Sequence, residues 1–372
     1  MSEERAFWLA WSRVAGVGAI LQKRIYLQFG SLKAAWAATP EELFEVDGIG
    51  KQSAIAICKS RNQLKPDQLF NEYKSQNFLT PADPDYPRIL FEIPDPPPTL
   101  FYRGQLQVLR DFDRAIAIVG TRNPSEYGRR WTRKLSTTLA TNGFTVISGL
   151  ADGIDAEAHQ SCVKVGGKTI AVLGTGVDLV YPHKNRQLYT QILETGLALS
   201  EYPAGTQPDR RHFPQRNRIV AGLSRAMIVT EAPEKSGALI TANLANDYGR
   251  DVYAVPGSLD NPNAIGCLDL IHKGAQIILG ETKFLEMIGN IPALDSVRHP
   301  EIESILADLE PSLSTVLKII HTIAQQSDHA AVPFDLIVQT AEMPTASVSS
   351  SLMQLELLGF VTQVPGMRYQ IA

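Results

Sequence analysis

The sequence has few cysteines, no long hydrophobic run and no strong excess of one charge. Its three cysteines, Cys58, Cys162 and Cys267, lie far apart and form no Cys-x-x-Cys pair, so we expect neither a disulfide framework nor a metal site. The longest apolar runs reach about five or six residues, far short of the ~20 needed to cross a bilayer. The first residues carry no signal-peptide pattern. We therefore expect a cytoplasmic protein that does not enter the membrane.

The composition excludes several protein classes. With 372 residues, 44% hydrophobic and 20% charged, the chain is neither collagenous nor disordered. At roughly 100–200 residues per domain, this length predicts two or three domains. The net charge of −4 gives no general indication of nucleic-acid binding. Residues 291–372 carry 3 Lys+Arg against 9 Asp+Glu, so this part is not expected to bind phosphates strongly.

Changes in hydrophobic periodicity divide the chain into domains. Residues 1–63 have apolar residues at helical spacing and predict an all-helical domain. Residues 64–290 form the second domain, whose proline-rich beginning, 64–110, predicts an extended lead-in without helix. Residues 291–310 are acidic and are interpreted as a linker, and residues 311–372 form a third domain.

The second domain alternates short β-branched runs with helical stretches. This alternation predicts βαβ units around a buried parallel sheet, which is a Rossmann-like, doubly wound α/β fold. The expected strands are Ala115–Val119, Thr145–Ser148, Thr169–Leu173, Ala226–Glu231 and Asp251–Val255.

Two copies of one turn occur in the N-terminal domain. Val14-Ala-Gly-Val-Gly18 and Val46-Asp-Gly-Ile-Gly50 indicate helix-hairpin-helix turns, as in SAM-like domains, and Lys51 follows the second copy. The glycines allow a tight turn whose backbone N–H groups can face a phosphate. Contact with a DNA backbone and a purely structural packing module remain equally open.

The first expected strand ends in Gly120-Thr121-Arg122. In doubly wound folds this strand-to-helix turn binds anions at the helix N-terminus, but no Gly-x-Gly-x-x-Gly is present, which disfavours a dinucleotide. Arg122 instead suits a phosphate contact or stacking on a base. A run of cations follows on the expected helix and is interpreted mainly as a solvated face: Arg129, Arg130, Arg133 and Lys134.

Acidic and histidine residues follow the second expected strand. Asp152, Asp155 and His159 have a spacing that places all three on one helix face. They could form a metal set or an acid/base pair. We favour helix capping and first-turn placement, because no further ligand cluster occurs nearby.

The densest basic segment runs from Arg210 to Arg218 and contains Phe213. Cations that neutralise a backbone, together with an aromatic platform for a base, are typical of single-strand binding. The alternative is that Phe213 is a core residue and the arginines pair with acids. Further candidates are Ser236-Gly237, which open a helix, and Lys168, although Lys168 precedes its strand and so lies opposite the usual ligand edge.

Together these residues resemble the DNA-processing protein A (DprA/Smf) family. The resemblance covers about residues 80–280 and rests on an ordered series of motifs: Ile118-Val-Gly-Thr-Arg122, Ser148–His159, Gly174–Asp178, Ser200–Pro203, Phe213–Ile219, Ser236–Ala242 and Ala254–Gly257. It implies an extended Rossmann domain that dimerises, binds single-stranded DNA and loads the RecA recombinase during natural transformation. No catalytic activity, cofactor or metal is implied. The family's DNA pocket maps to Gly120, Thr121, Arg122, Arg210 and Phe213, and also to Asn217 and Arg218.

The third domain predicts a winged helix. Its expected parts are a helix over Pro333–Thr340, a helix over Thr345–Leu358 and a hairpin over Val361–Ile371. Val348, Leu352, Leu355 and Leu358 are expected to form the core stripe of the second helix. That helix carries no Lys or Arg, so we favour a protein-contact or regulatory role over a major-groove reader.

Three functions remain to be weighed. The first is a single-stranded DNA-binding mediator that protects incoming DNA. The second is a nucleotide enzyme with the topology of phosphoribohydrolases, in which Glu231 would act. Against an enzyme, Asp152, Asp155, His159 and Glu231 form no recognisable catalytic set, and the absence of Gly-x-x-x-x-Gly-Lys-[Ser/Thr] disfavours ATP hydrolysis. The third is a scaffold with a vestigial pocket.

Overall fold

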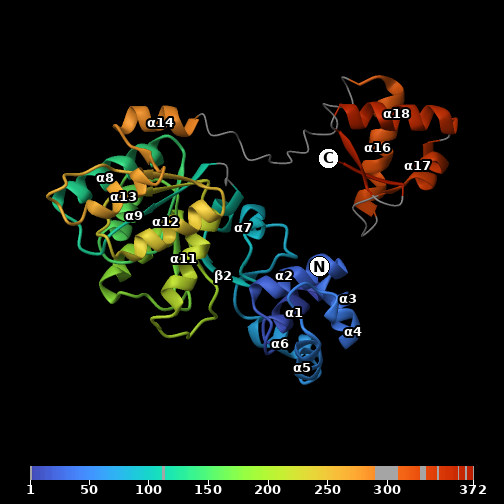
Figure 1. Cartoon of the computed structure of the whole chain (residues 1–372), viewed down its shortest axis with the longest axis horizontal. Helices are drawn as coiled ribbons and strands as arrows, with labels where there is room; N and C mark the ends of the chain where they lie inside the picture. Colours follow the sequence, from blue (N-terminus) through green and yellow to red (C-terminus); the bar gives the residue numbers. More distant parts are fainter. Residues whose placement is uncertain are drawn as a thin grey trace. The chain divides into compact units, whose positions relative to one another are not determined.

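Residues 2–110, 114–289, 309–326, 332–341, 343–358, 360–364 and 367–371 are described by the computed structural model. The chain divides into two units, residues 1–292 and 293–372 (Figure 1). All but two residues of the expected linker, 291–310, lie outside the described residues.

The first unit begins with short helices joined by the two predicted glycine turns. Gly16 and Gly48 have φ of +84° and +88°, which only glycine adopts easily, and Gly18 and Gly50 are the N-caps of the helices that follow. Two buried tryptophans, Trp8 and Trp11, lie in the core of this bundle. The helix-hairpin-helix geometry is therefore confirmed. The helices are α1 (Ser2–Trp11), α2 (Ala19–Phe29), α3 (Leu32–Trp36), α4 (Pro40–Phe44) and α5 (Lys51–Arg61).

The proline-rich segment contains helices, so the expectation of a helix-free lead-in is wrong. Pro66 occupies the first turn of its helix, where its missing N–H costs nothing, and Pro87 is an N-cap. The segment also adds two antiparallel strands to the edge of the sheet. Its elements are α6 (Pro66–Tyr73), β1 (Phe78–Leu79), α7 (Arg88–Glu92), β2 (Leu100–Gly104) and the 3-10 helix η1 (Leu106–Arg110).

Nine strands form one sheet in the order β1-β2-β6-β5-β4-β3-β7-β8-β9, and the strands from β6 to β9 are parallel. All five predicted strands are present, but those expected to end at Glu231 and Val255 end at Val229 and Ala254. Strands β1, β2, β6 and β9 were not among the predicted strands. The strands not yet given are β3 (Ala115–Val119), β4 (Thr145–Ser148), β5 (Thr169–Leu173), β6 (Leu197–Ser200), β7 (Ala226–Val229), β8 (Asp251–Ala254) and β9 (Gln276–Ile277).

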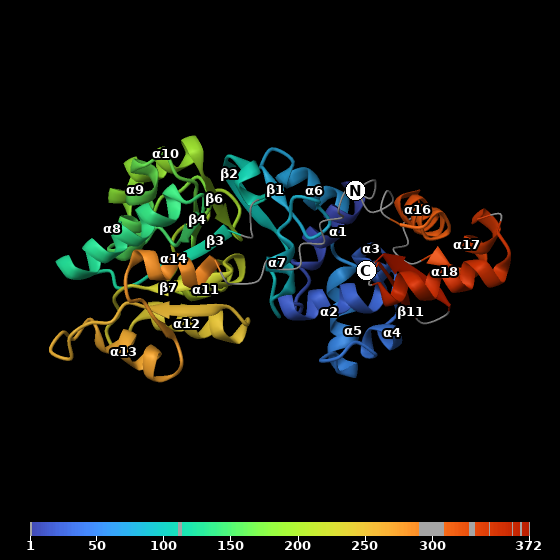
Figure 2. The same cartoon turned by 90° about the horizontal axis from the view of Figure 1, so that it is seen from above.

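Helices cover both faces of the sheet (Figure 2). Along β3, Ala115, Ala117 and Val119 pack toward one helix layer while Ile116 and Ile118 pack toward the other. The first layer holds α11 (His212–Leu223), α12 (Gly237–Asp247) and α13 (Ile265–His272). The second holds α8 (Glu126–Thr141), α9 (Ile154–Lys164), α10 (Arg186–Thr195) and α14 (Glu281–Gly289). This is the predicted doubly wound fold.

The second unit has the helices and small sheet of a winged helix, as predicted. Val348, Leu352 and Leu355 are buried, but Leu358 is 55% exposed because it lies beyond the last turn as the helix C-cap. Its place in the core stripe was therefore wrong. The elements are α16 (Pro311–Gln326), β10 (Val332–Pro333), α17 (Phe334–Ala341), α18 (Thr345–Leu357), β11 (Val361–Val364) and β12 (Arg368–Ile371). Among the described residues of both units, no helix is long and apolar enough to span a membrane.

Candidate nucleic-acid interface

A cavity of about 630 Å³ lies where the strand order of the sheet reverses. Strands β3 and β7 are neighbours there, and successive strands build outward from them in opposite directions. Doubly wound folds bind ligands at this point, outside the carboxyl ends of the strands. Eight predicted residues line the cavity: Gly120, Thr121, Arg122, Arg210, Phe213, Asn217, Ser236 and Gly237.

The turn after β3 is held rigidly by two neighbouring loops. Thr121 N donates to Glu231 O at 2.7 Å, and Ile154 N donates to Thr121 O at 3.1 Å. A Cβ on Gly120 would lie 2.6 Å from the Ile154 side chain and 2.8 Å from Glu231 O, so only glycine fits. The turn therefore presents the exposed Arg122 side chain at the cavity from a fixed backbone.

Two aromatic rings, Tyr181 and Phe213, form a platform in the cavity beside Arg122. The Arg122 Cζ lies 5.9 Å from the ring centroid of Phe213. The Tyr181 ring lies 5.6 Å from the Phe213 ring at an interplanar angle of 33°. A Cβ on Gly174 would come within 2.9 Å of Phe213, so this glycine makes room for the ring. The platform can receive a base by stacking, with a guanidinium beside it.

A buried arginine adds positive charge at the base of the cavity. Arg216 donates to the backbone oxygens of Gly149 and Val172. Burial lowers its pKa to about 10, which leaves it charged at neutral pH. Asp155 lines the same cavity and accepts from Gly149 N at 3.1 Å, and burial raises the pKa of its carboxyl group. This acid offsets the charge of Arg216 in part.

The start of α12 closes the other side of the cavity. Ser236 caps this helix by accepting from Ala238 N at 3.2 Å, and Gly237 leaves the first turn without a side chain. Lys235 precedes the cap and is exposed. Among the described lining residues, four cations face one acid: Arg122, Arg210, Arg216 and Lys235 against Asp155. The cavity therefore favours an anion that carries an aromatic group.

Two predicted residues lie elsewhere. Arg218 is buried and donates to Glu201 Oε1 at 2.5 Å and to the Asp95 backbone oxygen, so it does not face the cavity. Lys168 directly precedes β5. It therefore lies at the amino ends of the parallel strands, whereas the cavity lies at their carboxyl ends. The geometry therefore gives neither residue a place in a ligand site at the switch point.

Comparisons with known proteins identify the family of this chain. The model of the DNA recombination-mediator protein A family matches residues 77–289, and that of the DprA winged helix domain matches residues 302–367. Protein Smf of Synechocystis sp. is 48% identical over 99% of both chains. The chain belongs to the DprA/Smf family.

Two solved DprA structures share this fold. DNA processing protein A from Streptococcus pneumoniae matches with a TM-score of 0.67 at 35% identity, covering 76% of this chain and 97% of that one. DNA processing protein A from Helicobacter pylori, described with its single-stranded DNA binding mode, matches with a TM-score of 0.52 at 32% identity. That match covers 57% of this chain and 96% of that one.

In this DprA/Smf protein, the N-terminus of α8 already holds a carboxylate. Glu231 is 1% exposed and accepts from both the backbone N and the hydroxyl of Ser125, each at 2.7 Å. It also accepts from Asn261 Nδ2 at 3.0 Å. The expectation that this helix N-terminus receives a ligand anion was therefore wrong. Glu231 therefore fixes the start of α8 through Ser125 and ties it to Asn261.

The acidic and histidine residues after β4 do not share one helix face. Asp152 precedes α9 and pairs with Lys184 at 3.0 Å, so the predicted three-residue face was wrong. His159 is buried, with Nδ1 2.7 Å from Thr169 Oγ1, and burial lowers its pKa to about 3. Within the described ranges, no group of three or more His, Cys, Asp or Glu residues could hold a metal ion.

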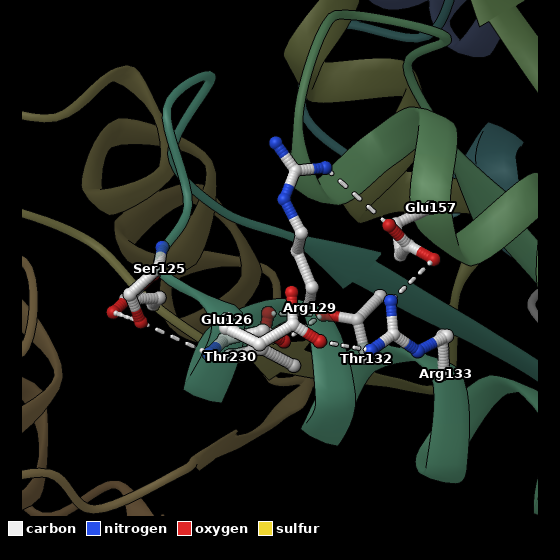
Figure 3. A network of polar contacts seen from close by, with 9 residues as sticks. Ser125, Glu126, Arg129, Thr132, Arg133, Glu157 and Thr230 are labelled. Atoms are coloured by element: carbon white, nitrogen blue, oxygen red, sulfur yellow. Dashed lines mark hydrogen bonds and ion pairs between the residues drawn. The ribbon is translucent and has the colours of Figure 1, made fainter.

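Three of the four predicted cations of α8 pair with acids at the surface, as the solvated-face interpretation predicted. Arg129 and Arg133 both reach Glu157 at 3.4 Å, and Arg133 also pairs with Glu126 (Figure 3). Lys134 pairs with Glu281 at 2.9 Å. These partners make Arg129, Arg133 and Lys134 poor phosphate contacts, while Arg130 lies over the ring of Tyr127.

Three cationic or aromatic residues that line the cavity were not predicted as site residues: Tyr181, Arg216 and Lys235. Lys235 directly precedes the predicted Ser236-Gly237, and Arg216 lies inside the predicted basic segment. The position of each residue in the sequence could therefore have indicated a place in the site. Tyr181 lies in the loop after β5, three residues beyond the motif Gly174–Asp178. Its contact with Phe213 depends on how the loop after β5 folds back over the sheet.

Proposed function

We propose that this chain binds single-stranded DNA in the cavity at the switch point. The observation that carries the proposal is the pairing of Arg122 with Phe213 among four cations. Cations would neutralise phosphates while Phe213 and Tyr181 stack with bases, which is the usual chemistry of single-strand binding. The Helicobacter pylori relative, described with such a binding mode, supports the same assignment.

We further propose that the protein is a recombination mediator that protects incoming strands and loads RecA during natural transformation. The description of the matching family, DNA recombination-mediator protein A, supports this role. A backbone-and-stacking mode with little base specificity suits a protein that must accept any incoming sequence.

The Rossmann domain is also the proposed site of homodimerisation. Strand β9 is the last strand of the sheet, and both of its residues, Gln276 and Ile277, are exposed. Leu279, just beyond, is 62% exposed. An open strand edge flanked by apolar side chains can pair with a second copy. An Ile277→Lys/Leu279→Lys variant should sediment as a monomer, while an unchanged mass would count against this interface.

The winged helix is proposed to contact protein rather than DNA. Met353 and Leu357, one turn apart on α18, are 67% and 82% exposed, and Arg368 is the only cation of the described wing strands. An Arg368→Ala variant of the full chain should bind single strands as the parent does. A marked loss of affinity would give the wing a DNA role.

The test of DNA binding is fluorescence anisotropy of a labelled single strand and of the same sequence as duplex, over a salt series. The parent should prefer the single strand, and Arg122→Ala and Phe213→Ala should each lose most of that binding. Arg130→Ala, on the exposed face of α8, is the matched control and should bind as the parent. If the parent fails to bind, or both pocket variants bind normally, the proposed site is wrong.

A further inference from the structure

A second cavity of about 450 Å³ adjoins the cavity at the switch point, which we call the switch-point cavity. The second one lies between α12 and α13, which pack on the same face of the sheet (Figure 2), and we call it the α12–α13 cavity. Four residues line both cavities: Lys235, Ser236, Gly237 and Ile240. The two cavities therefore meet at the start of α12.

Little separates the two cavities where they meet. A Cβ added to Gly237 would meet no atom within 4 Å, so the space over the first turn of α12 is open. Gly237 is itself exposed, and Ile240 is 51% exposed although its side chain is apolar. A long polymer held in the switch-point cavity can therefore leave it over the first turn of α12 and enter the α12–α13 cavity.

The charges of the α12–α13 cavity cancel, unlike those of the switch-point cavity. Among the described residues, its lining has two cations, Lys235 and Lys273, and two acids, Glu234 and Asp269. Lys273 Nζ lies 2.7 Å from Asp269 Oδ2, so these two charges offset each other. Lys235 also lines the switch-point cavity, where cations outnumber acids. A phosphate is therefore favoured where the cavities meet, and the neutral space between α12 and α13 can take the uncharged part of a nucleotide.

The walls of the α12–α13 cavity suit a nucleobase. Leu239, Ile240 and Leu270 give it apolar surface. Asn243 is exposed and lies three positions after Ile240, so the two side chains share one face of α12. Ligand sites usually combine apolar walls with a few polar groups of this kind. Because an asparagine amide both donates and accepts hydrogen bonds, it can contact the edge of any of the four bases.

We propose that a DNA strand held in the switch-point cavity crosses the start of α12 and places its next nucleotide in the α12–α13 cavity. A phosphate lies beside Lys235, and the base packs on Ile240 beside the amide of Asn243. This inference rests on the proposed DNA binding and adds the route by which the strand leaves the first cavity. The route selects no base, as suits a protein that binds single strands by backbone contacts and stacking.

The experiment measures whether a bound strand shields this face of α12 in the full chain. The three native cysteines are buried, so a thiol introduced at the surface is the main target of a maleimide. Asn243→Cys places a thiol in the α12–α13 cavity, and Asn246→Cys, exposed on the same helix outside the cavity, is the matched control. The probe is an oligo-dT of about 16 nucleotides, at the upper end of usual single-strand site sizes.

At saturating oligo-dT, modification of Asn243→Cys should slow severalfold, whereas modification of Asn246→Cys should keep its rate. The double variant Arg122→Ala/Asn243→Cys should lose the protection at the same strand concentration, because the strand is no longer held in the switch-point cavity. An unprotected Asn243→Cys, or equal protection of Asn243→Cys and Asn246→Cys, would overturn the inference.

Anisotropy with the same oligo-dT separates this inference from the proposed function. If the parent binds no strand, the proposed function fails and this inference fails with it. If the parent and Asn243→Cys bind, Arg122→Ala does not, and Asn243→Cys is modified as fast with the strand as without it, the switch-point cavity stands. In that case the strand leaves by another route, and only the α12–α13 cavity is rejected.

Discussion

The guanidinium of Arg122 lies over the ring of Phe213, although one residue follows β3 and the other lies in the first turn of α11. The contact brings a cation and a stacking surface to one edge of the cavity. A base on the ring would place its phosphate within reach of the guanidinium. The pair therefore acts as one element of the proposed site, and this coupling can be measured.

A double-mutant cycle on this pair should be non-additive. Phe213→Ala should cost about 1–3 kcal/mol of single-strand binding, the usual range for a stacked base. Arg122→Ala should cost less when Phe213 is already absent, because the cation then has no ring or stacked base to contact. Anisotropy titrations of the parent, the single variants and the double variant give the coupling. Strictly additive losses would contradict a joint site.

Two glycines of the cavity should respond differently to alanine. Gly120→Ala should destabilise the fold by about 1–3 kcal/mol, because its Cβ would meet Ile154 and the backbone of Glu231. A Cβ at Gly237 would meet no atom within 4 Å, so Gly237→Ala should melt at or above the parent temperature. Its single-strand affinity should nonetheless fall about tenfold, the equivalent of about 1.4 kcal/mol, because the Cβ occupies space at the start of α12. Unchanged affinity would exclude this helix start from the site.

Two exposed lysines should differ in their effect on salt dependence. Lys235→Ala should lower the slope of log affinity against log salt by about one, as expected for the loss of one phosphate contact. Lys168→Ala should leave the slope unchanged, because Lys168 lies at the amino end of β5. Equal slopes in both variants would place the strand on another surface.

Buried His159 should make the fold less stable in mild acid. Burial lowers its pKa from 6.5 to about 3, so below pH 6.5 the unfolded chain binds a proton that the folded chain does not. The stability present at pH 7 should therefore fall by about 2 kcal/mol at pH 5. Urea unfolding at both values measures this difference.

A neutral replacement tests the cause of this pH dependence. His159→Gln should remove most of the difference between pH 7 and pH 5, whereas His183→Gln, at an exposed histidine, should retain it. The same pH dependence in His159→Gln as in the parent would assign the effect to other groups.

Local chemistry explains why much of the fold was predictable. The apolar β-branched runs of β3, β4 and β5 end where predicted, because each is buried on both faces and is followed by glycine or a polar turn. Residues 64–110 were wrongly predicted to contain no helix. Proline is disfavoured inside a helix, but it is well accommodated in the first turn, as at Pro66, and at the N-cap, as at Pro87.

The sequence by itself determined the doubly wound fold and the segments from which the cavity is built, because strand periodicity and turn glycines are local properties of the chain. Only the tertiary structure decided which cations face that cavity. Arg216 and Arg218 lie two positions apart on one helix and point to different surroundings: Arg216 lines the switch-point cavity, and Arg218 pairs with Glu201. Their roles depend on distant segments of the chain that pack against α11, which no local pattern encodes.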